Sequence, residues 1–277
     1  MAQLGKFNRL KVIRHSASGA FLDGKSLGDI LLPKRYVEEG LAIGDTVEVF
    51  VYNDSEDRIV ATTERPKAVV GDCAYLKVVD TNRIGAFFDW GLPKDLLVPF
   101  NEQQKPMQKG YSYVVYLFVD ESTQRIAASS RLEDHLTSDI DIYKPRQAVD
   151  LLIYSKSDLG FKAVINNTHL GQLYENETFR KLHFGETVKG YIKNLRTDGK
   201  IDLILQLPAH IERESLADKI LEYIREQGGL STITDKSPPE LIYQTFGVSK
   251  ATYKKTLGLL YKNRQIKIDK HQLTLIE

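Results

Sequence analysis

The sequence predicts a mainly β protein in which three five-stranded barrels in tandem are followed by an α+β domain. Two observations predict this fold class. Short signatures return along the chain at constant offsets, and after Pro208 the apolar residues change from a strand-like to a helix-like spacing. Hydrophobic residues make up 42% and charged residues 27% of the 277 residues, which is a normal globular balance.

The repeat rests on three signatures that share one offset. Gly-Ala-Phe-Leu-Asp at 19–23 returns as Gly-Ala-Phe-Phe-Asp at 85–89, and Asp-Ile-Leu-Leu-Pro at 29–33 returns as Asp-Leu-Leu-Val-Pro at 95–99. Gly44 returns as Gly110, again 66 residues later. A weaker third copy, 75 residues further on, maps these positions to Gly160 and Gly185. We therefore expect three related units.

The first unit is predicted to contain five short strands, at 7–15, 19–23, 29–32, 45–52 and 58–63. Clusters of Gly, Asp, Asn and Ser separate them. Val47, Val49 and Val51 alternate along the fourth strand and define its core face. A flat sheet of five strands would leave one apolar face in water. A small Greek-key barrel, the OB-fold arrangement, removes this problem by closure.

The C-terminal region is predicted to be a winged helix-turn-helix. A first helix begins at Ser215, where Ser-Leu-Ala-Asp resembles a capping box, and stops at Gly228. A second opens at Ser237-Pro238 and ends at Gly247. Ser249 caps a third, which carries Tyr253, Leu257, Leu260 and Tyr261 on one face, and strands at 266–268 and 273–276 form a hairpin. We place the domains at 1–65, 66–142, 146–208 and 211–277.

The three units resemble the S1 RNA-binding domain. The matching segments are Gly-Ala-Phe-Leu at 19–22, Gly-Ala-Phe-Phe at 85–88, Gly-Asp-Thr-Val-Glu-Val at 44–49, Arg-Ile-Ala-Ala-Ser-Ser-Arg at 125–131 and the run at 198–206. Two features depart from the S1 pattern. The aromatic residue before the motif glycine is replaced by Ser18, Ile84 and Leu159, and the histidine after the third strand is replaced by Leu32 and Val98. Tyr174 keeps an aromatic residue there in the third unit.

Three S1-like units followed by a winged helix resemble the bacterial conserved virulence factor B (CvfB/YitL-like) family. The resemblance covers nearly the whole chain. It implies a cytoplasmic RNA-binding protein that regulates gene expression, including virulence, and it does not imply an enzyme.

Aromatic residues on the second strands are candidate base-stacking residues, because OB-folds bind oligonucleotides on that surface. They are Phe21, Phe87 and Phe88, with Trp90 enlarging the patch, and Tyr174 joins them in the third unit. Phe50, Tyr116 and Tyr191 share another repeat position, for which packing between barrels is the favoured interpretation over base stacking.

The segment 248–270 is strongly basic in a chain whose net charge is only +1. A winged helix presents its third helix and wing to nucleic acid, so this cluster is predicted to contact phosphates. Lysines on a solvated helix face are the alternative interpretation. The basic residues are Lys250, Lys254, Lys255, Lys262, Arg264, Lys267 and Lys270.

Enzyme functions find no support in the sequence. It contains no phosphate-binding loop, dinucleotide fingerprint or nucleophile elbow. No two of the six histidines lie three or four residues apart, as a helical zinc pair requires. The single cysteine, Cys73, excludes an intramolecular disulfide. We therefore expect no catalytic residues, no cofactor and no metal.

The function predicted from the sequence is non-enzymatic binding of single-stranded RNA with low sequence specificity, in post-transcriptional regulation. Two alternatives stay open. One is a transcription regulator that binds duplex DNA through the winged helix, and the other is a scaffold on a ribosome or ribonuclease assembly. The absence of a long apolar run and of a signal-peptide core predicts a cytoplasmic protein without a membrane partner.

Overall fold

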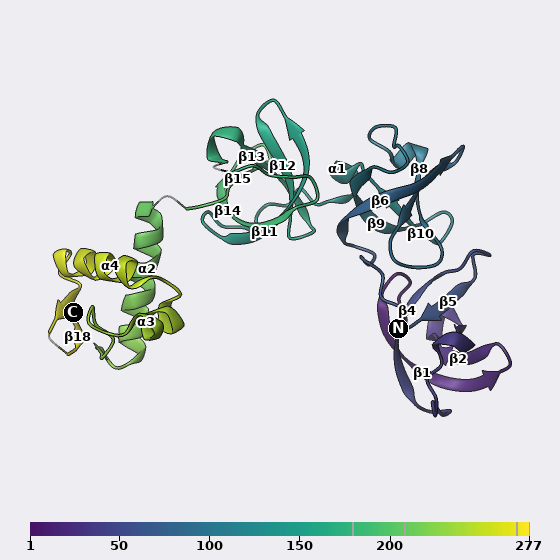
Figure 1. Cartoon of the computed structure of the whole chain (residues 1–277), viewed down its shortest axis with the longest axis horizontal. Coiled ribbons are helices and arrows are strands. Elements are labelled where there is room, and N and C mark those ends of the chain that lie inside the picture. The colour runs from purple at the N-terminus through teal and green to yellow at the C-terminus, as the bar shows by residue number, and fades with distance from the viewer. Residues whose placement is uncertain (179, 208, 270, 277) are drawn as a thin grey trace. The chain divides into compact units, whose positions relative to one another are not determined.

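The computed structural model in Figure 1 describes residues 1–178, 180–207, 209–269 and 271–276. The chain divides into two compact regions, an N-terminal region at Met1–Leu205 and a C-terminal region at Gln206–Glu277. In the described residues, the first region contains three five-stranded sheets, and the second contains three helices and a small sheet.

The first sheet is a closed barrel with the strand order β1-β2-β3-β5-β4. Its strands are β1 (Phe7–Ser16), β2 (Gly19–Asp23), β3 (Asp29–Pro33), β4 (Thr46–Asn53) and β5 (Ile59–Thr62). A bulge between Val12 and Arg14 lets β1 pair with β4 along its first half and with β2 along its second half. Bulges of this kind bend a strand, which closure of a small barrel requires.

The second sheet has the same five strands, but backbone hydrogen bonds do not close it. Its order is β10-β9-β6-β7-β8, so β8 and β10 are the two ends. These strands still lie next to each other. The predicted fold class of tandem five-stranded barrels is confirmed, although this unit is a half-barrel rather than a closed barrel. The strands are β6 (Cys73–Asn82), β7 (Gly85–Asp89), β8 (Leu96–Pro99), β9 (Ser112–Asp120) and β10 (Arg125–Ser129).

The third sheet is again a closed barrel, ordered β11-β12-β13-β15-β14. A parallel pairing of β13 with β15, from Gly171 with Ile201 to Leu173 with Leu203, closes it. Its strands are β11 (Ala148–Ser157), β12 (Gly160–Ile165), β13 (His169–Tyr174), β14 (Thr187–Leu195) and β15 (Ile201–Ile204).

Equivalent hydrogen bonds confirm that the three units are copies of one another. In each unit, the amide of a repeated glycine donates to the carbonyl beside the bulge of the first strand. The bonds are Gly44 to Val12 at 2.8 Å, Gly110 to Val78 at 2.9 Å and Gly185 to Ile153 at 2.7 Å. The offsets of 66 and 75 residues therefore correspond to the same structural position.

The glycine that opens each second strand is required by a close approach between strands. A Cβ atom at Gly19 would lie 2.0 Å from the carbonyl oxygen of Leu32, and one at Gly160 would lie 2.3 Å from that of Leu173. Gly19 also has a φ of 145°, which side-chain-bearing residues rarely adopt. The glycine of the Gly-Ala-Phe signature is thus needed because the start of β2 lies very close to the end of β3.

The first and second sheets share one apolar core. Phe50 of β4 is fully buried, and its ring lies 5.7 Å from that of Trp90, edge to face. Both residues belong to the cluster that contains Phe88 and Leu96 of the second unit. The Nζ atom of Lys94 adds a polar contact, because it donates to the carbonyl of Asp54 at 2.6 Å.

The second and third sheets meet around a smaller cluster. Cys73, Leu132 and Val164 are buried together there, and Leu132 begins the one-turn helix α1 (Leu132–His135) between the two sheets. The amide of Cys73 donates to the Asn167 side chain at 3.2 Å. These contacts connect β6 to the loop that joins β12 and β13.

The C-terminal region has the element order of a winged helix: α2 (Ala209–Glu226), β16 (Leu230–Ser231), α3 (Pro239–Phe246), α4 (Lys250–Lys262), β17 (Ile266–Ile268) and β18 (Leu273–Leu275). Pro239 occupies the first turn of α3, and Gly247 ends that helix in the left-handed conformation. The Ser249 side chain caps α4 by accepting from the Thr252 amide at 3.2 Å. The prediction that the first helix begins at Ser215 is wrong, since α2 begins at Ala209.

Candidate nucleic-acid interface

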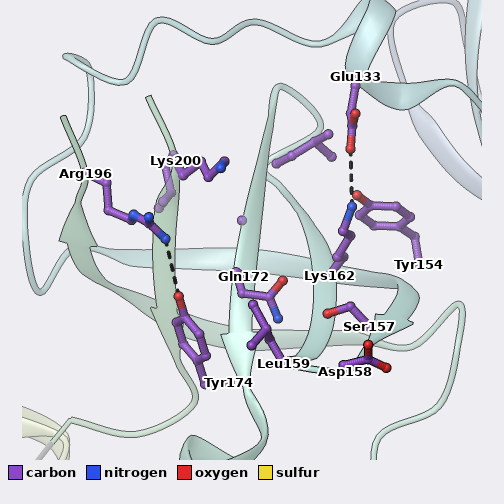
Figure 2. A pocket seen from close by; sticks show the side chains of 13 residues that line it. Glu133, Tyr154, Ser157, Asp158, Leu159, Lys162, Gln172, Tyr174, Arg196 and Lys200 are labelled. Carbon is purple, nitrogen blue, oxygen red and sulfur yellow. Dashed lines mark hydrogen bonds and ion pairs between the residues drawn. The ribbon is translucent and has the colours of Figure 1, made fainter. Parts of the chain in front are cut away.

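The third barrel carries a cavity of about 470 Å³ on the face of β12 and β13 (Figure 2). The turn between β11 and β12 and the hairpin between β14 and β15 form its rims. OB-folds bind oligonucleotides on the equivalent face, between the equivalent loops. The residues that Figure 2 labels are Glu133, Tyr154, Ser157, Asp158, Leu159, Lys162, Gln172, Tyr174, Arg196 and Lys200.

Cationic side chains approach this cavity from two sides. Figure 2 shows Arg196 and Lys200 on one side, and Lys162 pointing toward Glu133 on the other. Lys162 lies 3.3 Å from the Glu133 carboxylate, and Arg196 and Lys200 lie 3.2 and 3.3 Å from Asp198. Surface ion pairs of this kind contribute at most about 1 kcal/mol each, so phosphate oxygens can replace the carboxylates as partners.

Tyr174 lines the cavity, where its ring is partly exposed and its hydroxyl makes two hydrogen bonds. The hydroxyl donates to Asp202 at 3.3 Å and accepts from Arg196 at 3.5 Å. These contacts limit the side-chain entropy that the ring would lose on stacking with a base. The sequence prediction of Tyr174 as a site residue therefore falls on the cavity, together with neighbours that the sequence did not reveal.

Lys162 occupies the position that phenylalanine holds in the other units. Phe21 pairs with Leu31, Phe87 pairs with Leu97, and Lys162 pairs with Gln172. The signal was present in the sequence, because Lys162 follows Phe87 by the 75-residue offset. The third barrel thus presents a cation and an amide where the first two present a ring and a leucine.

The ring of Phe21 already has a partner. The Arg14 guanidinium lies 3.3 Å from its centroid. A nucleic-acid base would have to displace this side chain or stack on it. Phe87 is partly exposed on β7, the corresponding strand of the second unit. The two phenylalanines and Tyr174 lie on different sheets and do not form one cluster.

Phe88 is a wrong prediction. Its side chain is fully buried in the core of the second unit, beside Leu96 and Leu117, so it cannot stack on a base. Trp90 is 3% exposed and donates its indole N–H to the Lys94 carbonyl at 2.6 Å, so it does not enlarge an exposed patch. Alternation along the strand explains the error, because Phe87 and Phe88 must point to opposite faces.

The assignment of Leu32 and Val98 to the histidine position of S1 domains is also wrong. Tyr174 pairs with Gly160, whereas Gly19 pairs with Pro33 and Gly85 with Pro99. Leu32 and Val98 are core residues. The first two units therefore have proline where the third has tyrosine.

The recurring aromatic position behaves as predicted in two of the three units. Phe50 packs between the first and second sheets. Tyr116 lies beside the buried cluster between the second and third sheets, where its ring stacks on His135 at 5.4 Å. The packing interpretation is thus confirmed for both of these residues.

The basic residues of the winged helix surround the exposed face of α4. Lys254, Lys255 and Lys262 are exposed on the helix, while Lys250 is half-buried and donates to the Ser237 carbonyl at 2.9 Å. Arg264 and Lys267 are exposed and, with Tyr261 and Lys262, line a hollow of about 390 Å³ beside β17. Lys270 lies outside the described residues.

Tyr261 differs from its predicted place on the core face of α4. Its side chain is 59% exposed, whereas Tyr253, Leu257 and Leu260 are buried. An exposed ring thus stands among the basic residues, a combination suited to phosphate and base contacts.

Within the described ranges, no group of three or more His, Cys, Asp or Glu side chains is placed to hold a metal ion. No described helix is long and apolar enough to cross a membrane.

Comparison with known proteins agrees with this architecture. The family model of the S1 domain matches residues 4–64, and that of the CvfB-like winged helix domain matches residues 218–275. Conserved virulence factor B of Staphylococcus saprophyticus is 26% identical over 99% of this chain and 95% of its own length. The chain is similar to the conserved virulence factor B proteins along nearly its whole length. The protein of that name from Staphylococcus aureus strain MRSA252 is also 26% identical, over 98% of this chain and 94% of its own length.

A solved structure is similar to the chain as well. It is the crystal structure of a multidomain protein with nucleic acid binding domains from Streptococcus pneumoniae, with 26% sequence identity and a TM-score of 0.42. The similarity covers 99% of this chain and 98% of the other. The two family models confirm the S1 resemblance for residues 4–64 and the winged-helix resemblance for residues 218–275.

Proposed function

We propose that this relative of conserved virulence factor B binds single-stranded RNA and acts without catalysis, as a post-transcriptional regulator. The observation that carries this proposal is the cavity on the third barrel. It lies where OB-folds bind oligonucleotides, and a tethered ring and three cations line it. The cations would contact the phosphates, and Tyr174 would provide a stacking surface for a base.

The exposed basic face of α4 supports a second candidate function, the binding of duplex DNA. Lys254, Lys255 and Lys262 are exposed on the third helix of the winged helix, the element that such domains place in a major groove. The same face would serve single-stranded RNA as an electrostatic contact. The two candidate functions therefore differ in which nucleic acid needs α4 for its binding.

One binding experiment tests both candidates. The variant R196Q/K200Q should weaken binding of single-stranded RNA and lower the slope of log K against log salt by about 1.4, because each phosphate contact on a single strand contributes about 0.7. The matched control is R9Q/K11Q, which removes one arginine and one lysine from exposed positions of β1. Equal losses in both variants would contradict a site on the third barrel.

The same titration on the variant K254Q/K255Q/K262Q separates the candidates. If α4 contributes electrostatically to RNA binding, affinity for single-stranded RNA should fall similarly for all sequences and the salt slope should decrease. If only duplex DNA binding is lost and single-stranded RNA binding stays intact, the transcription-regulator function is favoured. Unchanged binding of both nucleic acids would assign α4 to a solvated or protein-docking surface.

A further inference from the structure

A second hollow, of about 410 Å³, lies between the second and third sheets of the N-terminal region. We call it the junction groove. Its lining differs in composition from that of the cavity on the third barrel. Five residues are aromatic, two are lysines, and none of the described lining residues is Asp or Glu. The aromatic residues and lysines are Tyr75, Tyr111, Tyr113, Tyr154, Phe184, Lys105 and Lys156.

Three of these rings are unusually exposed. Tyr75 is 43% exposed, Tyr111 62% and Phe184 50%. Aromatic side chains that gather at an exposed position mark a binding surface more often than single exposed residues do. Fixed backbone carries two of these rings, because Tyr75 lies within β6 and Phe184 precedes Gly185, whose amide donates to Ile153 at 2.7 Å.

Gly185 explains how the two sides of the groove meet. A Cβ atom at this position would lie 2.0 Å from the ring of Tyr75, so the ring of the second unit rests on the backbone of the third. Gly185 also has a φ of 81°. A side chain here would push the two sheets apart, and glycine therefore brings Tyr75 and Phe184 to one groove.

The junction groove adjoins the cavity on the third barrel at Tyr154. This residue of β11 lines both hollows. It also lines a smaller hollow of about 210 Å³, which shares Glu133 with the cavity and Gln104 and Ser130 with the groove. A nucleic-acid strand that leaves the cavity past Tyr154 would therefore reach the groove.

We propose that the junction groove binds the segment of single-stranded nucleic acid next to the one held in the cavity of the third barrel. The proposal rests on the proposed function. Exposed rings would stack on bases, and the lysines would contact the phosphates between them. The lysines and the lack of acidic lining residues favour a polyanion over an apolar peptide. Lys105 is exposed at the rim, whereas Lys156 is held near Glu175 at 3.1 Å and over the ring of Phe161.

The test compares a short and a long oligonucleotide. One OB-fold binds about 4–16 nucleotides, so only the long RNA can occupy both the cavity and the groove. Oligouridylates of about 4 and about 20 nucleotides would be titrated onto the full chain. The variant Y111A/F184A should weaken binding of the long RNA at least about tenfold and leave the short RNA within about twofold. Its thermal midpoint should stay near that of the unaltered protein, because both rings are exposed.

The single variant Y111A has Y243A as its matched control. Both tyrosines are similarly exposed, at 66% and 62%, but Tyr243 lies on α3, far along the chain from the groove. Y111A should weaken the long RNA about fivefold or more, and Y243A should not. The variant K105Q offers a check that changes no ring, since it should lower the salt slope for the long RNA alone, by about 0.7.

The possible results separate this proposal from the proposed function. If the unaltered protein binds neither RNA, the proposed function fails. If it binds both and Y111A/F184A binds the long RNA as tightly as the unaltered protein, the junction groove does not hold nucleic acid. Equal weakening of the short and long RNAs would also overturn the proposal, because the groove would then not extend the path.

Discussion

At the scale of single residues, burial decides the chemistry of the only thiol. Cys73 begins β6, in the cluster that joins the second and third sheets, and burial raises its pKa from 9.0 to about 12. The nearby carboxylate of Asp72 acts in the same direction. Since the thiolate is the reactive form, Cys73 is a packing residue and not a nucleophile.

We predict that the folded protein resists alkylation at about pH 8, whereas the protein in denaturant reacts at the rate of a free thiol. The folded-state pKa lies above the unfolded value, so ionisation of Cys73 should destabilise the fold as the pH rises above 9.0. Mass spectrometry after timed alkylation provides the measurement, with the variant C73S as a blank. Rapid labelling of the folded chain would show that the junction between the sheets opens.

At the scale of elements, the strands were the easiest part of the structure to predict. The predicted strands of the first unit agree with β1 to β5 to within one residue at either end, because alternation and turn residues mark each of them. The start of α2 was missed, since Ser215 resembles a cap although the residues before it are also helix formers. β16 was not predicted. This strand has two residues, too few for a periodic pattern, and it forms because it pairs with β18.

The candidate site was harder to predict than the fold, because distant elements build it. Glu133 comes from α1, Tyr154 from β11, and Arg196 from the hairpin between β14 and β15. No local pattern links such residues. Phe88 shows the opposite problem, since a motif named the residue but the pleat points it into the core. Tyr174 was found because it keeps an aromatic residue at a position of the S1 pattern, and Lys162 could have been found because it follows Phe87 by the 75-residue offset.

The glycines of the winged helix allow a test of element stability. Gly258 lies within α4 on its exposed side, and nothing lies within 4 Å of a Cβ atom built there. The variant G258A should therefore stabilise the winged helix by up to about 1 kcal/mol, because glycine is the poorer helix former. Thermal unfolding followed by circular dichroism would show the rise in the midpoint.

The control for this prediction is G247A. Gly247 has equally open surroundings, but it ends α3 with a φ of 69°. A side chain is strained in that conformation, so the same substitution should destabilise the domain. Changes of the same sign in both variants would contradict the assigned helix boundary.

At the scale of the whole molecule, the first two sheets should unfold together. Phe50 belongs to the first sheet but is buried in the core of the second. The variant F50A should lose about 3–5 kcal/mol of stability, as large-to-small changes of buried aromatic residues do. The loss should appear in the fluorescence of Trp90, the only tryptophan, whose ring lies 5.7 Å from Phe50.

Urea unfolding of F50A, followed by tryptophan fluorescence, measures this coupling. The variant F100A is the control, because Phe100 is 55% exposed and its truncation leaves no cavity. If the Trp90 transition of F50A coincides with that of the unaltered protein, the two sheets fold independently.

The shared core of the first two sheets has a consequence for the thermodynamics of any multivalent contact. Domains joined by flexible linkers lose orientational freedom when they bind one ligand together. Here the ring of Phe50 and the ring of Trp90 already fix the two sheets against each other during folding. The entropy cost of orienting the two sheets therefore arises when the protein folds and not when a ligand binds. A ligand that spans both sheets thus binds a preorganised surface. Loosening this joint should weaken avidity even where every contact residue is left in place.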